Sequence, residues 1–253
     1  MTLVIAHRGN SSAAPENTFA SFESAIGLGA TLVECDVQMT ADGHIVVIHD
    51  PTLERTSDVG GDVRKLSLAE VKAADVSYPK TFGDRFSPQR VATLGELLAF
   101  LKGRARLMLE IKKESSAADS DEFERRIAAA IVASGARVTN DRETDVALLS
   151  FSTPILERMR DVLPEAPRGH LFYRDPEDVI FAAAEKVKAS FVMPEKGHLS
   201  QGLLENARRL GLDVATWVCD DPEEFRHLSA LGLLGIGTNR PADMLPRRAS
   251  SRS

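Results

Sequence analysis

The chain has 253 residues, of which 43 % are hydrophobic and 27 % charged, a balance typical of a soluble globular protein. Its net charge of −6 provides no electrostatic footprint for nucleic acid or an anionic membrane, and no apolar run is long enough to cross a bilayer. Two cysteines, Cys35 and Cys219, cannot form a disulfide framework, and no signal segment precedes the first apolar run. These features predict a cytoplasmic protein.

Strand-like apolar runs alternate with helix-like runs along most of the chain. The expected parallel strands are 3–7, 31–37, 106–112, 146–151, 169–173, 190–193, 213–219 and 234–238. The expected helices are 17–28, one from about Thr93, 123–133, 154–163, 176–187, 201–210 and 222–231. Eight parallel strands with intervening helices predict an α/β fold, a closed TIM (β/α)8 barrel. An open doubly wound sheet is the alternative, but no glycine-rich fingerprint follows the first strand.

One further run, 44–49, follows the second strand after only four residues, Thr-Ala-Asp-Gly, which cannot hold a crossover helix. It therefore predicts an antiparallel hairpin. A four-residue loop would pair Met39 with His44 and so set Glu34 opposite His49, whereas an odd loop would turn that histidine away. We interpret the next stretch, 51–92, as a small insertion within a single domain, 1–253, with a short helix at 68–74. The last residues, 247–253, are typical of a frayed tail.

Two strands carry alternating acidic side chains near their carboxyl ends. Glu34 and Asp36 share one face of the second strand, and Glu110 and Lys112 share one face of the next. Three converging carboxylates without a sulfur ligand favour a hard divalent cation, Mg²⁺ or Ca²⁺. Lys112 would then lie beside it as a positive charge for a phosphate oxygen. The alternative is that the acids form ion pairs with a neighbouring arginine or lysine.

Two histidines end apolar runs on the same side as the carboxylates. His7 closes the first strand and His49 the hairpin arm, so the pair could serve as acid and base in phosphoryl chemistry. The single tryptophan, Trp217, ends the seventh barrel strand, where it can be core or a ligand-facing wall. We favour the wall, because the carboxyl ends of barrel strands form active sites.

Taken in order, these residues resemble the glycerophosphodiester phosphodiesterase family, in its bacterial cytoplasmic type. The matching stretches are His7-Arg8-Gly9, Pro15-Glu16-Asn17-Thr18, Glu34-Cys35-Asp36-Val37, Thr40-Ala41-Asp42-Gly43, His49-Asp50, Leu53-Glu54-Arg55-Thr56, Glu110-Ile111-Lys112, Ser150-Phe151 and Trp217. The resemblance implies a TIM barrel that hydrolyses glycerophosphodiesters to glycerol 3-phosphate and an alcohol. It implies His7 and His49 as general acid and base, a divalent metal on Glu34, Asp36 and Glu110, and Arg8 and Lys112 as phosphate-binding residues, with Trp217 at the substrate.

Two positions depart from the family pattern. Asp220 stands where the family often has asparagine, and Asn239 where it usually has aspartate. An amide and a carboxylate keep a donor–acceptor match when they exchange places, so we expect the two side chains to meet. Two other functions stay open: a phospholipase C-like or D-like barrel acting on intact lipid, and a non-catalytic phosphate-ligand binding barrel. The expected partner is a small glycerophosphodiester, without nucleic acid or membrane insertion, and homo-oligomerisation stays open.

Overall fold

A computed structural model describes residues 2–115, 120–141 and 143–246, so the expectation for 247–253 lies outside the described residues. The strands are β1 (Leu3–His7), β2 (Leu32–Met39), β3 (Ile45–Val47), β4 (Arg106–Ile111), β5 (Val146–Ser150), β6 (Arg168–Phe172), β7 (Phe191–Pro194), β8 (Asp213–Thr216) and β9 (Gly235–Thr238). The α-helices are α1 (Phe19–Gly27), α2 (Leu68–Ala73), α3 (Pro79–Phe82), α4 (Leu94–Leu101), α5 (Glu122–Ser134), α6 (Thr153–Val162), α7 (Glu177–Val187), α8 (Gln201–Arg209), α9 (Pro222–Ser229) and α10 (Pro241–Met244). Short 3₁₀ helices are η1 (Val63–Lys65), η2 (Gly83–Phe86), η3 (Lys113–Ser115) and η4 (Lys196–His198).

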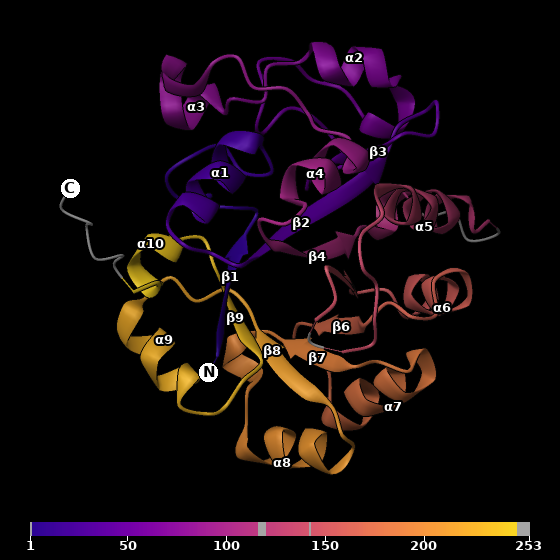
Figure 1. Cartoon of the computed structure of the whole chain (residues 1–253), viewed down its shortest axis with the longest axis vertical. Helices are drawn as coiled ribbons and strands as arrows, with labels where there is room; N and C mark the ends of the chain where they lie inside the picture. The colour runs from indigo at the N-terminus through magenta and orange to yellow at the C-terminus, as the bar shows by residue number, and fades with distance from the viewer. Residues whose placement is uncertain (1, 116–119, 142, 247–253) are drawn as a thin grey trace.

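The parallel strands close into a barrel. They follow the order β1-β9-β8-β7-β6-β5-β4-β2, and a parallel pairing of β1 with β2 completes the ring. Helices lie around the outside of this ring, with α5 to α9 following one another along its circumference (Figure 1). The predicted TIM barrel is confirmed, and the open sheet is excluded because both edges of an open sheet would be unpaired.

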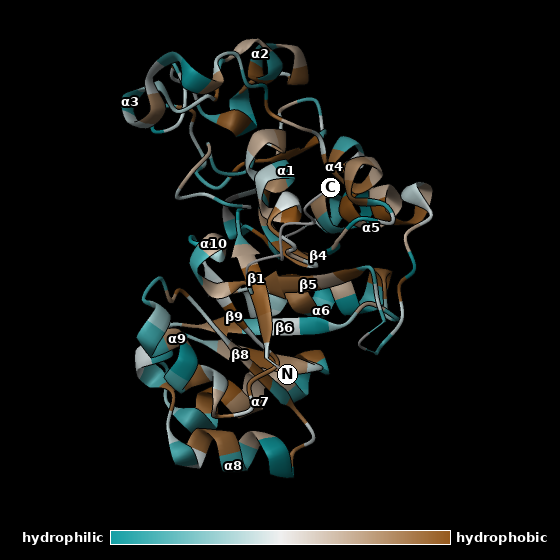
Figure 2. Ribbon diagram, turned by 60° about the vertical axis from the view of Figure 1, so that its left-hand side comes forward, coloured by the Kyte–Doolittle hydropathy of each residue, from teal (hydrophilic) through white to brown (hydrophobic). Residues whose placement is uncertain are grey.

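Two apolar layers hold the barrel together, one inside the ring and one between the strands and the helices. The outer layer contains Val33, Cys35 and Val37, the face of β2 opposite to its carboxylates, packed with apolar side chains of α4 and α5. Strands are mainly brown in Figure 2, whereas the outward faces of α8 and α9 carry teal, hydrophilic residues. The alternation along β2 therefore sends its acidic residues to the barrel interior, as the sequence predicts.

The predicted hairpin register is wrong by one residue. Met39 pairs with Ile45 instead of His44, because the loop spans five residues from Thr40. The Thr40 hydroxyl accepts from the His44 backbone N–H at 2.9 Å, and the Thr40 N–H donates to the carbonyl of His44 at 2.9 Å. Gly43, at φ +81°, supplies the left-handed residue that the turn needs. The side chain of Thr40 thus closes a longer loop than residue spacing alone indicated.

His49 nevertheless lies at the carboxyl end of the barrel, because β3 stops two residues before it and the chain then bends. β3 ends at Val47, and Ile48 makes one further hydrogen bond to the carbonyl of Asp36 before the chain bends. The carbonyl of His49 then accepts from Gln38 Nε2 at 3.0 Å. The argument that required Glu34 opposite His49 is therefore incorrect, and the bend after β3 takes over the role that we assigned to the register.

The stretch 51–92 carries α2, α3 and two 3₁₀ turns over a small apolar cluster of its own. That cluster joins Leu53, Val63 and Val71 to Val46 and Ile48 of the hairpin. The expected short helix is confirmed as α2, which Ser67 and Glu70 start with reciprocal side-chain to backbone hydrogen bonds. The assignment of 51–92 as an insertion within one domain stays a prediction.

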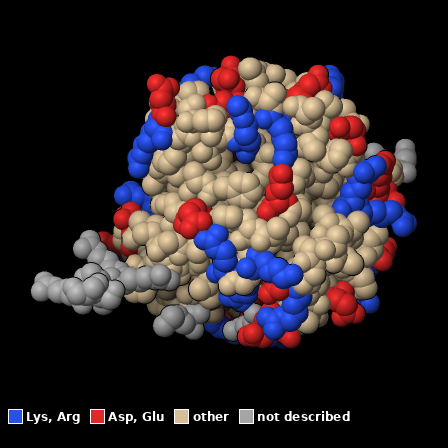
Figure 3. Space-filling model, turned by 45° about the horizontal axis from the view of Figure 1, so that its top comes forward, with Lys and Arg blue, Asp and Glu red and all other residues tan. Residues whose placement is uncertain are grey.

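No helix in the described ranges is long and apolar enough to cross a membrane. On the face drawn in Figure 3, basic and acidic side chains are interspersed, with uncharged surface between them.

Candidate active site

The site begins at the sharp turn that follows β1. Arg8 and Gly9 both have left-handed backbones, at φ +56° and +83°. A side chain at Gly9 would lie 2.6 Å from the backbone carbonyl carbon of Ser21, so only glycine fits there. The turn aims the Arg8 N–H at Glu34 Oε2, at 3.0 Å. A non-glycine residue held in this conformation is a feature typical of functional sites.

Strand register brings the predicted acidic residues together. In the parallel ladder Glu34 is level with His7, and Asp36 is level with Glu110, so all four side chains face the interior. One oxygen from each of Glu34, Asp36 and Glu110 lies within 4.8 Å of the others. All three residues are buried. The predicted convergence of the three carboxylates is confirmed.

Two cations compensate part of this negative charge. Lys112 Nζ lies 2.8 Å from Asp36 Oδ1 and also contacts Glu110, while Arg8 Nε lies 3.1 Å from Asp36 Oδ2. The alternative interpretation, in which the acidic residues form ion pairs, therefore also holds in part: Asp36 pairs with both Lys112 and Arg8. Glu34 Oε1 is different, since it is buried without a hydrogen-bond partner among the described residues. An unpartnered carboxylate oxygen beside two other acids fits a divalent cation.

The ionisation of the three acids follows from their surroundings. Burial raises the pKa of Glu34 well above its usual range, and repulsion from Asp36 and Glu110 adds to this. Burial and the charge of Asp36 raise the pKa of Glu110 to about 7. Burial would also raise the pKa of Asp36, but Lys112 and Arg8 more than offset it and hold that pKa below its usual range. A bound cation would relieve the repulsion that keeps the other two acids partly protonated.

A three-residue chain of hydrogen bonds supports His7. Its Nδ1 lies 2.7 Å from Asn239 Oδ1, and Asn239 Nδ2 donates to Asp220 Oδ2 at 2.8 Å. Asp220 Oδ1 accepts from the Asn239 backbone at 2.7 Å and from the hydroxyl of Thr238 at 2.9 Å. The expected contact between the two departing residues is therefore confirmed, and it continues to His7. Burial, followed by the charge of Arg8, lowers the pKa of His7 to about 4.

His49 has a different support, made of charged groups. Its Nδ1 lies 2.5 Å from Asp50 Oδ1, and Asp50 Oδ2 accepts from Arg55 Nε at 2.6 Å. Arg55 also donates to both oxygens of Glu16, at 2.7 and 2.8 Å, and Glu16 in turn accepts from Arg8 at 2.9 Å. Burial lowers the pKa of His49, while Asp36 and Asp50 oppose this change. The two histidines thus have separate supports and are not each other's Nδ1 partners.

Sequence reasoning assigned no role to Glu16, Asn17, Asp50 or Arg55, although all lie in stretches that match the family. Asn17 donates from Nδ2 to Asp36 Oδ2 at 2.8 Å and has a left-handed backbone, at φ +58°. The available signal was position: Glu16 and Asn17 lie in the loop between the first strand and the first helix, at the carboxyl end of the barrel.

Trp217 lies in another part of the mouth, among aromatic residues. Its ring centroid is 5.5 Å from that of Phe151 and 6.4 Å from that of Tyr173, and its Nε1 donates to the carbonyl of Met193 at 3.0 Å. These rings follow β5, β6 and β8, whereas the charged groups come from β1, β2, β4 and the end of the hairpin. The mouth of the barrel therefore has an ionic half and an aromatic half.

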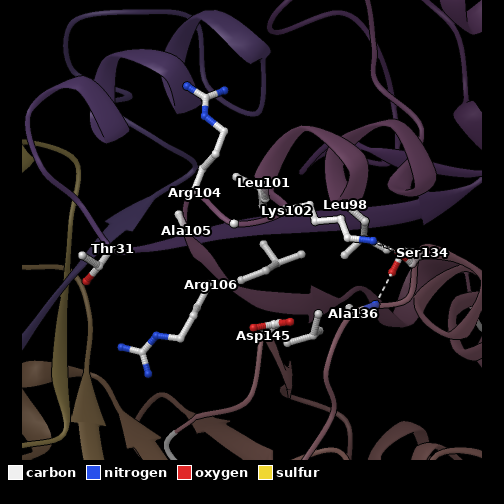
Figure 4. A pocket seen from close by; sticks show the side chains of 13 residues that line it. Thr31, Leu98, Leu101, Lys102, Arg104, Ala105, Arg106, Ser134, Ala136 and Asp145 are labelled. Atoms are coloured by element: carbon white, nitrogen blue, oxygen red, sulfur yellow. Dashed lines mark hydrogen bonds between the residues drawn. The ribbon is translucent and has the colours of Figure 1, made fainter.

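Cavities among the described residues also lie at the opposite, amino-terminal end of the strands. One, of about 360 Å³, is lined by Leu3, Met108 and Phe191, among others. Another, of about 270 Å³, lies by α4 and the start of β4; in Figure 4 the Arg104 and Arg106 guanidinium groups diverge, and Lys102 is turned to the carbonyl of Ser134.

Together, the fold and this site define an α/β-barrel protein with a two-histidine, three-carboxylate centre at the carboxyl ends of its strands. The model of the glycerophosphoryl diester phosphodiesterase family matches residues 7–243, and the chain belongs to that family.

Proteins similar to the chain over nearly its full length agree with this membership. A glycerophosphodiester phosphodiesterase of Caldanaerobacter subterraneus subsp. tengcongensis is 32 % identical over 96 % of each chain. The crystal structure of a glycerophosphodiester phosphodiesterase from Agrobacterium tumefaciens is 28 % identical, with a TM-score of 0.81 over 97 % of this chain and 99 % of that one. A phosphodiesterase from Oleispira antarctica, solved in complex with the product sn-glycerol-3-phosphate, is 26 % identical, with a TM-score of 0.83 over 96 % and 95 %.

Proposed function

We propose that this chain hydrolyses glycerophosphodiesters to glycerol 3-phosphate and an alcohol, with His7 and His49 as proton-transfer groups and a divalent cation at the three carboxylates. As a member of its family, the chain is a phosphoric diester hydrolase. The observation that carries the mechanism is that two separately supported histidines adjoin one buried acidic cluster: His7 Nε2 lies 3.9 Å from Glu34 Oε2, and the charge of Asp36 acts on the pKa of His49. The product bound to the related Oleispira antarctica enzyme supports the substrate class.

Glu34, Asp36 and Glu110 would hold the cation, Mg²⁺ or Ca²⁺. When bound, it supplies positive charge to the non-bridging phosphate oxygens as negative charge develops on them. Arg8 and Lys112 reach the same place from β1 and β4 and add to that charge. Trp217 and its aromatic neighbours offer an apolar wall to an ester arm of the substrate.

The support of each histidine favours one order of proton transfer. His7 contacts a neutral amide and is buried, so it suits the proton acceptor, whereas the carboxylate of Asp50 stabilises His49 as an imidazolium donor. His7 would accept the proton of the substrate's 2-hydroxyl as that oxygen bonds to phosphorus. His49 would donate a proton to the alcohol oxygen as its bond to phosphorus breaks. A water molecule then opens the cyclic phosphate, with the two roles reversed.

Release of glycerol 3-phosphate from glycerophosphocholine, measured with no added metal, with Mg²⁺ and with Ca²⁺, tests the proposal. We expect release that requires one of the two metals and disappears with a chelator. Release without any metal would contradict the cation site. Release only from phospholipid vesicles would favour the lipid-acting alternative, and no release under any condition would favour the binding barrel.

A further inference from the structure

The side-chain amide of Asn239 has one chemically allowed orientation. Asp220 accepts the backbone N–H of Asn239 and the hydroxyl of Thr238, and a carboxylate in this position can only accept hydrogen bonds. The amide group that faces Asp220 Oδ2, at 2.8 Å, must therefore be the NH₂. It follows that the carbonyl oxygen of the amide, and not its nitrogen, faces His7.

This orientation determines which nitrogen of His7 carries the proton. Asn239 Oδ1 is an acceptor, so His7 Nδ1, at 2.7 Å, must donate to it. In a neutral ring Nε2 then holds the lone pair. His7 Nε2 lies 3.9 Å from Glu34 Oε2, on the side of the acidic cluster. A histidine in the other tautomer would present its lone pair to Asn239 and an N–H to the site.

We propose that Asp220 and Asn239 are positioning residues that hold His7 in its Nδ1-protonated tautomer, with the Nε2 lone pair directed into the site. The use of that lone pair as a proton acceptor rests on the function proposed above, but the tautomer itself does not. Ser11 Oγ lies 3.0 Å from Asn239 Oδ1 and 2.8 Å from the carbonyl of His7, so its single hydroxyl proton serves two acceptors and the orientation of the amide rests on Asp220.

The exchange of asparagine and aspartate relative to the family pattern preserves a hydrogen-bond acceptor opposite His7 Nδ1. With aspartate at position 239 and asparagine at position 220, an acceptor would still face His7 and the amide would donate from the other side. What changes is the location of the negative charge. In this chain the group in contact with His7 is the neutral amide of Asn239, and the carboxylate of Asp220 lies on the far side of that amide.

Four variants separate positioning from general support of the loop. Asn239→Leu removes the acceptor for Nδ1, and Asn239→Asp places two carboxylates face to face. Asp220→Asn combined with Asn239→Asp restores a matched pair with the acceptor on His7. Asp221→Asn is the control: it also neutralises a carboxylate after β8, but the Asp221 side chain caps α9 through the backbone N–H groups of Glu223 and Glu224.

The direct measurement is the ¹⁵N spectrum of the His7 ring, assigned with a His7→Gln variant, at about pH 8, where the ring is neutral. In the native chain and in the double variant we expect a protonated Nδ1 and an unprotonated Nε2. In Asn239→Leu we expect a mixture of tautomers. A native spectrum with Nε2 protonated would overturn the proposal, and so would an unchanged ring in Asn239→Leu. The native spectrum decides the matter even if a variant does not fold.

Turnover gives the second readout. Asn239→Leu should lower kcat by about 10²-fold with little change in KM, because a wrong tautomer disables a base without removing it. Asn239→Asp should also lower kcat, because repulsion between the carboxylates at positions 220 and 239 moves the acceptor away from His7. The double variant should regain most of that loss, and Asp221→Asn should match the native chain. Equal kcat values in Asn239→Asp and the double variant would contradict positioning. If the chain hydrolyses no diester, the function fails, but the ring spectrum still tests the tautomer.

Discussion

Arg55 and Glu16 form a two-point ion pair that joins the loop after β1 to the chain after β3. Arg55 Nη1 and Nη2 donate to the two Glu16 oxygens at 2.7 and 2.8 Å, while its Nε donates to Asp50 at 2.6 Å. One planar guanidinium thus fixes two carboxylates at once, a geometry that lysine cannot reproduce. Because Asp50 holds His49 and Glu16 holds Arg8, this pair links the supports of two proposed site residues.

We therefore predict that Arg55→Lys lowers kcat/KM by about tenfold while leaving the fold intact, since the charge stays but the two-point geometry is lost. Steady-state kinetics on glycerophosphocholine, with circular dichroism to check folding, measures this. Arg64→Lys is the matched control, because Arg64 also pairs with an aspartate, Asp62, in an exposed position of the same segment. Equal losses in the two variants would show that Arg55 has no special role.

Replacement of Glu110 by glutamine keeps its shape and removes its charge. If the carboxylates hold the cation, Glu110→Gln should weaken Mg²⁺ or Ca²⁺ binding by about tenfold or more, measured by calorimetry, and part of the activity should return at high metal concentration. Glu205→Gln, an exposed change on α8, is the control. Metal affinity that stays the same in Glu110→Gln would exclude this residue from the cation site.

The two histidine roles can be separated by the leaving group. A p-nitrophenolate leaving group departs without a proton, so an enzyme that lacks its general acid should lose less rate on a p-nitrophenyl ester than on a choline ester. We predict this partial recovery for His49→Gln in the first turnover, followed as release of the alcohol by rapid quench, because opening of the cyclic phosphate is common to both substrates. We predict a similar, large loss on both substrates for His7→Gln. Recovery in His7→Gln instead would reverse the assignment of donor and acceptor.

Period-two alternation and element spacing were enough to predict the barrel and the ionic centre. Glu34, Asp36 and Glu110 converge because side-chain direction along a parallel strand follows directly from residue parity. The hairpin register was not predictable in this way, since the length of the loop depends on a side-chain hydrogen bond from Thr40. His49 lies in the site through a bend after β3, a feature that periodicity does not encode.

The supports of the histidines were only partly predictable, for a similar reason. Asp220 and Asn239 could be paired because two neighbouring strands end beside each other and their side chains are chemically complementary. Arg55 lies in an irregular segment, where no repeat relates residue number to direction, so its three-way contact with Asp50 and Glu16 emerges only from the folded chain.

A buried histidine outside the site gives a prediction for stability. His170 Nδ1 lies 2.9 Å from the carbonyl of Leu171, which it must donate to, and its Nε2 accepts from the hydroxyl of Thr153 at 2.8 Å. The ring also stacks on Phe172 with centroids 4.1 Å apart. Burial lowers the pKa of His170 below that of an unfolded histidine, because the charged ring would lose its hydration.

The sign of the pH effect follows from this shift. As pH falls below about 6.5, the unfolded chain binds a proton at His170 that the folded chain does not, so protonation favours unfolding. The contribution of His170 to stability is fully present above that pH and declines below it, by at most about 1.4 kcal/mol per pH unit. His170→Gln should therefore show a shallower fall of the unfolding free energy between about pH 6.5 and 5 than the native chain, measured by urea denaturation. His227→Gln, a change at an exposed position of α9, should keep the native slope. A native slope in His170→Gln as well would show that this ring does not contribute to the acid sensitivity of the fold.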